Sequence, residues 1–479
     1  ERFSLHEFDT VGTASLITRT TNDTNQVQQV LVIMLNMMLG APMMAIGGII
    51  LAINQDATLA WVLVAAVPIL VLAILFIMTR AIPLFQVMQK KLDRLNLILD
   101  EGLTGVRVIR AFDRNAHEQA RFDVANRDLT DIAITVNRIT ATLWPIMMLV
   151  LNFSSIAILW FGAIRIDQGH MQVGALFAFL QYAMQILFAF LMLSMMFILL
   201  PRAAASATRI NEVLRMKPEI ADPKAPMRAD ALRGVVEFRD VTFSYPGAEE
   251  PALSHISFAA RPGEITAIVG GTGAGKSTLI SLIPRFYDVD SGQVLVDGVD
   301  VREQTQQRLR AKIGFVPQKA VLFSGSVSDN IQYGKGTALP DEIEHAAAVA
   351  QASSFIRAMP DGFDAIISQG GTNVSGGQKQ RLSIARALVR RPEVYIFDDS
   401  FSALDYATDA RLRAALKPET SLSSVFIVAQ RVSSVMSADQ IIVLDEGRVA
   451  GIGTHRELME SSRVYREIVL SQLSAEEIA

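Results

Sequence analysis

Four stretches of the chain are long, apolar and free of charged residues. They lie at about residues 30–53, 57–79, 139–164 and 171–200. Each exceeds the roughly 20 residues that an α-helix needs to cross a hydrocarbon core of about 30 Å. The pattern therefore predicts four membrane-spanning helices. The alternative is that they are buried helices of a large soluble protein.

The loops between these stretches differ in charge. Residues 54–56 and 165–170 carry one Lys or Arg between them, whereas residues 80–138 carry ten. Lys and Arg concentrate on the cytoplasmic side of membrane proteins. We therefore expect the long loop, and everything after the fourth span, to be cytoplasmic.

The long loop is polar but keeps the apolar spacing of a helix. Leucines recur every three or four residues from Leu92 to Leu103, which is the period of one helix face. The spans are therefore predicted to continue as helices into the cytoplasm. Gly102 and Gly105 are expected to break them into a hairpin with an exposed tip, a solvated linker being the alternative.

A second region begins after a polar, proline-bearing stretch at residues 216–233, which we interpret as a linker. Beyond it, short β-rich runs alternate with helical ones, a pattern typical of an α/β domain. The predicted fold class is a multidomain membrane protein. An all-α transmembrane domain at residues 1–215 is followed by an α/β domain at residues 234–475.

Composition supports this division and excludes some functions. Hydrophobic residues make up 51% of the chain and the mean hydropathy is +0.32, with the excess before residue 201. The net charge of −4 and the lack of a lysine-rich tract argue against a nucleic-acid partner. Without cysteine there is no disulfide or thiolate chemistry.

A glycine-rich segment lies between an apolar run, 265–269, and a helical one, 279–283. A strand, glycine loop and helix in this order are typical of a phosphate-binding loop, in which backbone N–H groups converge on an anion at a helix N-terminus. The expected ligand is ATP with Mg²⁺, the lysine reaching the outer phosphates and the serine hydroxyl binding the metal. The predicted binding residues are Gly270, Gly271, Thr272, Gly273, Ala274, Gly275, Lys276, Ser277 and Thr278.

Two further groups fit a nucleotide site. The buried run 394–397 is followed by Asp398 and Asp399; the first carboxylate is expected to hold Mg²⁺, and the second to orient an attacking water. Residues 235–238 and 241–245 are predicted to be antiparallel strands, and Tyr245 on the second is placed to stack on adenine. An exposed strand tyrosine without a ligand is the alternative.

A second anion site is predicted where a helix begins at Ser375, Gly376, Gly377 and Gln378. One domain then carries two phosphate-binding surfaces far apart in the chain. The economical explanation is a head-to-tail pair of domains that encloses two nucleotides between them.

This set of motifs, in this order, resembles the ATP-binding cassette (ABC) exporters over nearly the whole chain. The resemblance implies that residues 270–278 are the Walker A loop, Asp398 the Walker B carboxylate and Ser375–Gln378 the signature motif. It implies that Gln318 contacts Mg²⁺ and the membrane domain, and that the D-loop includes Ser402 and Asp405.

The resemblance also concerns the membrane half. Two cytoplasmic coupling loops are expected near residues 8–16 and 108–116. Half-transporters of the family have six spans, with the first coupling loop after the second span. We therefore expect two further spans ahead of residue 1, so that four of six are present here.

Three positions depart from the family pattern. Asp399 stands where a catalytic glutamate is expected, Gln430 where a histidine is expected, and Gln369 replaces the glutamate usually found before the signature. The six histidines lie elsewhere in the chain. Groups that bind ATP are kept, whereas groups that cleave it are altered, and we interpret Asp399 and Gln430 as degenerate catalytic residues.

The sequence thus predicts the degenerate-site half of a heterodimeric exporter in a bacterial-type cell membrane. Its partners are a second half-transporter, membrane lipid and a cargo. The spans contain no acid or base, only residues such as Asn36, Gln181 and Gln185; this favours a hydrophobic or amphipathic cargo, although such residues also join helices. A homodimeric exporter with slow ATPase, and an ATP-gated channel or regulatory ABC protein, are the alternatives.

Overall fold

The structure is a computed structural model that describes residues 3–227 and 232–472. The chain divides into two compact units, which are described separately below: residues 14–215, and residues 1–13 together with 216–479. Parts of the predicted linker (228–231) and of the predicted second domain (473–475) lie outside the described residues.

The unit at residues 14–215 consists of long helices joined by short turns. Within the described residues, four helical segments are long and apolar enough to cross a membrane, and each overlaps one of the predicted spans. The helices are α2 (Thr13–Thr18), the π-helix η1 (Arg19–Asp23), α3 (Thr24–Gln55), α4 (Ala60–Thr104), α5 (Val106–Ala111), α6 (Asn115–Ala141), α7 (Leu143–Asp167) and α8 (Val173–Arg215).

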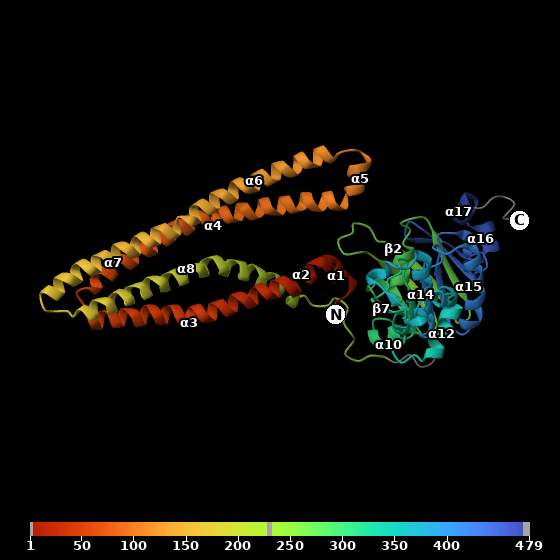
Figure 1. Cartoon of the computed structure of the whole chain (residues 1–479). Coiled ribbons are helices and arrows are strands. Elements are labelled where there is room, and N and C mark those ends of the chain that lie inside the picture. The colour runs from red at the N-terminus through yellow and green to blue at the C-terminus, as the bar shows by residue number, and fades with distance from the viewer. Residues whose placement is uncertain (1–2, 228–231, 473–479) are drawn as a thin grey trace. The chain divides into compact units, whose positions relative to one another are not determined.

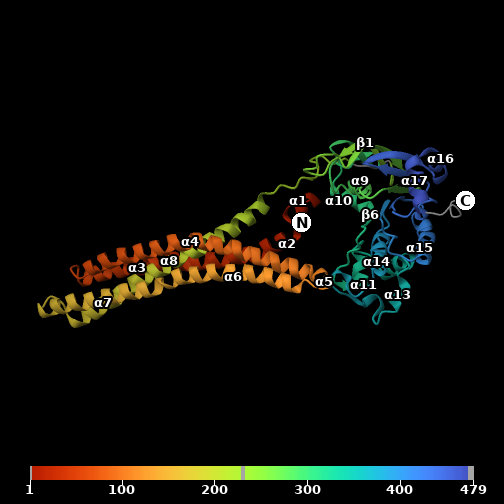
Figure 2. The same cartoon turned by 90° about the horizontal axis from the view of Figure 1, so that it is seen from above.

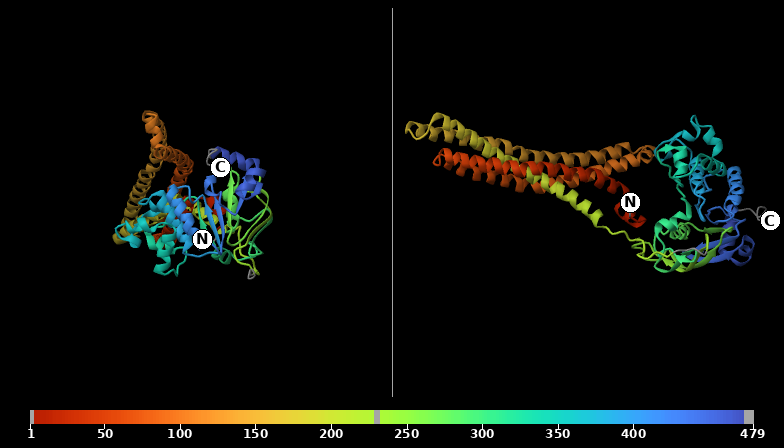
Figure 3. Two further views of the ribbon diagram at one scale, coloured as in Figure 1. Left: turned by 90° about the vertical axis from the view of Figure 1, so that its right-hand side faces the viewer. Right: turned by 90° about the horizontal axis from the view of Figure 1, so that it is seen from below.

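The long helices are arranged in pairs. Helix α3 lies along α8 and α4 lies along α6 (Figure 1), and the same pairs are seen from the other sides in Figures 2 and 3. Gly48 on α3 permits close approach to α8, because a Cβ there would come within 2.8 Å of Ile186. Helix α5 forms the turn between α4 and α6, and Phe112 beside it is 74% exposed, so the expected helical hairpin is present. The break falls at Gly105, whereas Gly102 lies inside α4 and does not interrupt it.

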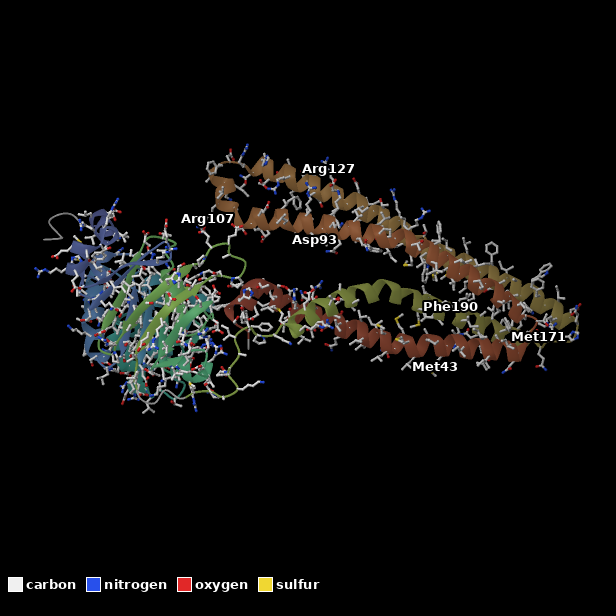
Figure 4. All side chains as sticks on the ribbon, turned by 180° about the vertical axis from the view of Figure 1, so that it is seen from behind. Met43, Asp93, Arg107, Arg127, Met171 and Phe190 are labelled. Carbon is white, nitrogen blue, oxygen red and sulfur yellow. The ribbon has the colours of Figure 1, made fainter. Side chains whose placement is uncertain are left out.

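Side chains divide these helices into an apolar part and a polar part. Met43 and Phe190 lie on the apolar part, whereas Asp93, Arg107 and Arg127 lie on the polar part (Figure 4). Large apolar side chains face outward along the spans; the exposed fractions of Trp61, Phe153 and Trp160 are 70%, 68% and 69%, respectively. An outward-facing apolar surface of this kind suits contact with lipid.

The other unit is built on three sheets. A six-stranded sheet, in the order β12-β11-β3-β10-β9-β6, is parallel except for β12; a four-stranded antiparallel sheet has the order β2-β1-β4-β5, and β7 pairs with β8. The strands are β1 (Val236–Phe243), β2 (Leu253–Ala260), β3 (Ile265–Gly270), β4 (Ser291–Val296), β5 (Val299–Asp300), β6 (Ile313–Val316), β7 (Gly325–Ser326), β8 (Ile366–Ile367), β9 (Val394–Asp398), β10 (Ser424–Val428), β11 (Gln440–Asp445) and β12 (Arg448–Gly453).

The helices of this unit are α1 (Leu5–Val11), α9 (Lys276–Leu282), α10 (Gln306–Ala311), α11 (Val327–Gln332), α12 (Pro340–Val349), α13 (Ser353–Arg357), α14 (Gly376–Leu388), α15 (Tyr406–Glu419), α16 (His455–Ser461) and α17 (Arg463–Gln472), with the 3₁₀ turns η2 (Gly362–Asp364), η3 (Gln369–Gly371) and η4 (Val432–Ser434). One face of the six-stranded sheet packs against α9 and the four-stranded sheet, and the other face packs against helices such as α14, α15 and α17. Because both faces are covered, the central strands read as continuous apolar runs. Strand β10, for example, is buried at all of its residues.

Two details differ from the sequence prediction. The antiparallel strands expected at 235–238 and 241–245 form a single strand, β1, whose pairing with β2 shifts register between Phe238 and Val241. At the shift, apolar and polar residues no longer alternate along the strand, so the sequence there resembles a turn between two strands. Residues 3–13 group with the residues from 216 onward and not with the predicted transmembrane domain; the buried Glu7 carboxylate, for example, accepts a hydrogen bond from the Glu219 backbone N–H (2.7 Å).

Candidate nucleotide-binding site

The glycine-rich loop connects β3 to α9 as the spacing predicted. Gly275 ends the loop with φ of 92°, and a Cβ there would lie 2.9 Å from the carbonyl oxygen of Ala252, so the left-handed turn requires glycine. The Lys276 ammonium donates to the carbonyl oxygens of Gly270 (2.9 Å) and Gly271 (2.6 Å). It therefore lies over the concavity formed by the loop, at the positive end of α9.

Asp398 lies at the end of β9, on the same edge of the sheet as the loop. Asp398 is 8% exposed, and its carboxylate accepts a hydrogen bond from the Ser277 hydroxyl (3.0 Å). Burial raises the pKa of the Asp398 carboxyl, and burial also lowers the pKa of the nearby Lys276 ammonium. A hydroxyl and a buried carboxylate in contact are oxygen ligands of the kind Mg²⁺ takes beside a triphosphate, so these residues fit the metal.

Asp399 is held differently from its neighbour. Its backbone is left-handed, with φ of 44°, a conformation that Asp adopts more readily than most residues. One carboxylate oxygen, Oδ2, accepts from the side-chain amide of Gln430 (2.9 Å) and more weakly from that of Gln318 (3.4 Å). Two neutral amides, and no ionisable donor, are thus its hydrogen-bond partners among the described side chains.

Tyr245 lies just beyond the end of β1, not on the strand itself. Its hydroxyl is 2.9 Å from the Thr278 hydroxyl, and its ring meets those of Phe243 and Tyr287 edge to face. With 39% of the residue exposed, part of the ring remains free beside the loop. The structure therefore brings Tyr245 to the phosphate-binding loop.

The residues of the predicted signature motif begin α14. Ser375 caps this helix: its hydroxyl accepts from the Gln378 backbone N–H (3.3 Å), and Gln378 Oε1 accepts from the Ser375 N–H (2.8 Å). A Cβ on Gly377 would lie 3.1 Å from the carbonyl oxygen of Ala403, which places the helix start against the 402–405 turn. Among the described hydrogen bonds, none joins Ser375 to the phosphate-binding loop, and both Ser375 and Gly376 are exposed.

The 402–405 turn connects Asp399 to α15. The Ser402 hydroxyl donates to the Asp399 carbonyl oxygen (2.9 Å), and Asp405 caps α15 by accepting from the Thr408 N–H (2.9 Å). Two residues that the sequence did not single out, Arg413 and Gln472, contact the segment around Gln430. No local motif marks them, because both act on backbone atoms brought near by the fold.

Fold, loop and sheet edge together define an ATP-binding cassette joined to a membrane domain. Residues 2–190 match the family model described as the ABC transporter transmembrane region, and residues 253–402 match the model described as ABC transporter. The chain belongs to the ABC transporter family. It is a multi-pass membrane protein whose nucleotide-binding domain is cytoplasmic.

Several relatives match nearly the whole chain. An uncharacterized ABC transporter ATP-binding protein of Mycobacterium tuberculosis is 46% identical over 98% of this chain and 81% of its own length. The Bacillus subtilis ABC transporter ATP-binding protein YfiB is 40% identical over 99% and 82%. A solved bacterial Atm1-family ABC exporter with ATP bound has a TM-score of 0.84 and 28% identity, over 99% of this chain and 83% of that one.

Proposed function

We propose that this chain is the degenerate-site half of a heterodimeric ABC exporter that moves a hydrophobic or amphipathic cargo. The observation that carries the proposal is the contrast between Asp398 and Asp399. Asp398 is buried and bonded to Ser277. Asp399 is one methylene shorter than the glutamate expected from the family pattern, and among the described side chains its carboxylate accepts hydrogen bonds only from the amides of Gln430 and Gln318.

Binding of ATP depends on groups that the chain supplies itself. The N-terminus of α9 and the Lys276 ammonium receive the phosphates, and Tyr245 offers its ring to the adenine. Mg²⁺, when bound, neutralises charge on the outer phosphates. The Ser277 hydroxyl and Asp398 carboxylate would hold it, with Gln318 nearby.

Cleavage is expected to be slow in this pocket. Asp399 must orient the attacking water, and a carboxylate that is one methylene short misplaces it by about 1 Å, a displacement that costs about 100-fold in rate. The Gln430 amide donates a hydrogen bond but cannot gain or lose a proton near neutral pH, as an imidazole does.

The start of α14 serves the partner's nucleotide in this proposal. Ser375 and Gly376 are exposed and retain the signature sequence. A partner subunit docked head to tail would place its own nucleotide on this helix N-terminus. Closure of the two domains on ATP is then passed to the spans by the loops near residues 8–16 and 108–116.

A cavity between the spans supports the assignment of the cargo. It has a volume of about 660 Å³ and is lined by α3, α4, α7 and α8, which is within the size range of small-molecule sites. Met147, Trp144 and Phe188 are among its apolar walls, and Gln181 and Gln185 provide the polar side chains. An uncharged lining of this kind suits an apolar or amphipathic molecule.

Substitution in the two anion sites tests the assignment. Lys276→Ala should reduce steady-state ATPase activity of the native complex only partly, because the partner's pocket performs most turnover. Ser375→Ala should reduce it more strongly, since that serine completes the partner's pocket. If Lys276→Ala abolishes turnover while Ser375→Ala is mild, the roles of the two pockets are reversed.

The alternatives make different predictions. A homodimeric exporter with slow ATPase gives a native mass of two identical chains. An ATP-gated channel or regulatory ABC protein shows flux that requires ATP binding but not cleavage, measured as uptake into vesicles with a non-hydrolysable analogue.

A further inference from the structure

The backbone around Gln430 is held by hydrogen bonds from a side chain on α17, the last described helix. The Gln472 amide at the end of α17 donates to the Gln430 carbonyl oxygen (2.9 Å), and its Oε1 accepts from the Val432 N–H (2.9 Å). One side chain therefore bridges two backbone groups on either side of Arg431. We call residues 430–434 the switch segment.

The other end of the switch segment is held from α15. An Arg413 guanidinium nitrogen, Nη1, donates to the Ser434 carbonyl oxygen (2.5 Å), and Nε donates to Asp409 (2.8 Å). The guanidinium also lies over the Phe401 ring, 4.4 Å from its centre. The switch segment is thus fastened at its end to the turn that follows Asp399.

Helix α17, which carries Gln472, is packed firmly into the core. Tyr465 and Val469 on it are fully buried, and the Tyr465 hydroxyl is 2.8 Å from Nδ1 of His455 on α16. Because these residues anchor the helix in the core, Gln472 is carried by a fixed element rather than by a loop.

These contacts leave the Gln430 side chain with a defined reach. Its amide carries two N–H donors, and one of them bonds Asp399 Oδ2. Asp399 directly follows Asp398, whose carboxylate accepts a hydrogen bond from Ser277 of the phosphate-binding loop. The bond to Asp399 therefore places the Gln430 amide close to that loop, with its second N–H donor available to a phosphate oxygen. Because the Gln430 carbonyl oxygen is bonded to Gln472, the backbone of Gln430 is held in place.

We propose that Gln472 is a positioning residue that holds Gln430 where its amide senses the third phosphate of the bound nucleotide. Gln472 would then set the preference of this pocket for ATP over ADP. The inference rests on the proposed function only in taking the pocket of this chain as a place where ATP is held. It does not depend on how quickly ATP is cleaved there.

The test compares affinities for ATP and ADP in the purified native complex, read by photolabelling of this chain with 8-azido nucleotides. Gln472→Ala should weaken ATP binding about three- to tenfold, the range expected for one or two hydrogen bonds, while ADP binding changes less than about twofold. Gln472→Glu, which keeps the acceptor but loses the donor to Gln430, should be similar. Glu467→Ala, on the exposed side of the same helix, is the matched control.

A double-mutant cycle separates positioning from a merely structural role. If Gln472 acts through Gln430, Gln472→Ala adds little to Gln430→Ala, because the two effects share one cause. Equal losses of ATP and ADP affinity, or effects that add fully, would overturn the proposal. Rapid cleavage of ATP in the pocket of the unmodified chain would contradict the proposed function but leave this test standing.

Discussion

The loops after the neighbouring parallel strands β3 and β10 meet at one edge of the sheet but depend on different atoms. In the proposed function, the loop after β3 binds phosphate through backbone N–H groups and a single lysine. The loop after β10 contributes the side chain of Gln430, which acts on Asp399 after β9. A single substitution replaces a side chain, whereas it leaves the backbone N–H group at that position in place. A chain can therefore lose rapid cleavage at two positions and keep both its fold and its hold on ATP.

Restoring the two side chains should have the largest effect. Asp399→Glu combined with Gln430→His is expected to raise single-turnover cleavage of ATP in this pocket about 100-fold, because the longer carboxylate regains the position for water. Rapid-quench measurement of phosphate release checks it. The single variants are the controls, and since residue 399 has φ of 44°, their melting temperatures should be compared. An unchanged rate in the double variant would show that another step limits cleavage.

Removing the lysine of the first loop should have the next largest effect. Lys276→Ala deletes a charge-assisted contact to phosphate and is expected to raise the ATP dissociation constant of this pocket about 10- to 100-fold. Equilibrium binding of labelled ATP measures it. Lys417→Ala, an exposed lysine on α15, is the control for loss of charge alone. A Lys276 variant that binds ATP normally would mean that the backbone groups suffice.

Tyr245 separates the contribution of a ring from that of a hydroxyl. Tyr245→Ala should weaken ATP binding about tenfold, in the range of base–aromatic stacking. Tyr245→Phe removes only the contact with the Thr278 hydroxyl and should stay within about threefold. The same binding assay reports both. If Tyr245→Phe weakens ATP binding as much as Tyr245→Ala does, the hydroxyl and not the ring face contributes to nucleotide binding.

The sequence was sufficient where local pattern determines structure. Long uncharged stretches predict the spans, and a strand, glycines and a helix in that order predict the loop at residues 270–278. Both features depend only on residues that are close together in the chain. The sequence interpretation divided β1 in two, because its shifted register at Phe238 and Val241 resembles a turn. Residue types at 399 and 430 were visible, but not that the two side chains share a hydrogen bond.

Contacts between distant segments could not be predicted. Arg413 and Gln472 lie 21 and 40 residues from the backbone groups that they hold, Ser434 and Val432. No periodicity or motif records which carbonyl a glutamine will find, because that follows from the packing of α15 and α17 on the sheet. Likewise, only the fold joins Glu7 to Glu219.

The metal ligands of the first loop allow the smallest and most selective test of the comparison. Ser277 bonds Asp398 at 3.0 Å, so its hydroxyl belongs with the metal rather than with the phosphate alone. Ser277→Ala should weaken ATP binding several-fold when Mg²⁺ is present, the size of one lost ligand or hydrogen bond. When Mg²⁺ is chelated, the variant and the unmodified chain should bind ATP equally, within about twofold. An equal loss in both conditions would assign the hydroxyl to phosphate. The bound Mg²⁺ would then have one protein ligand fewer, with Asp398 remaining.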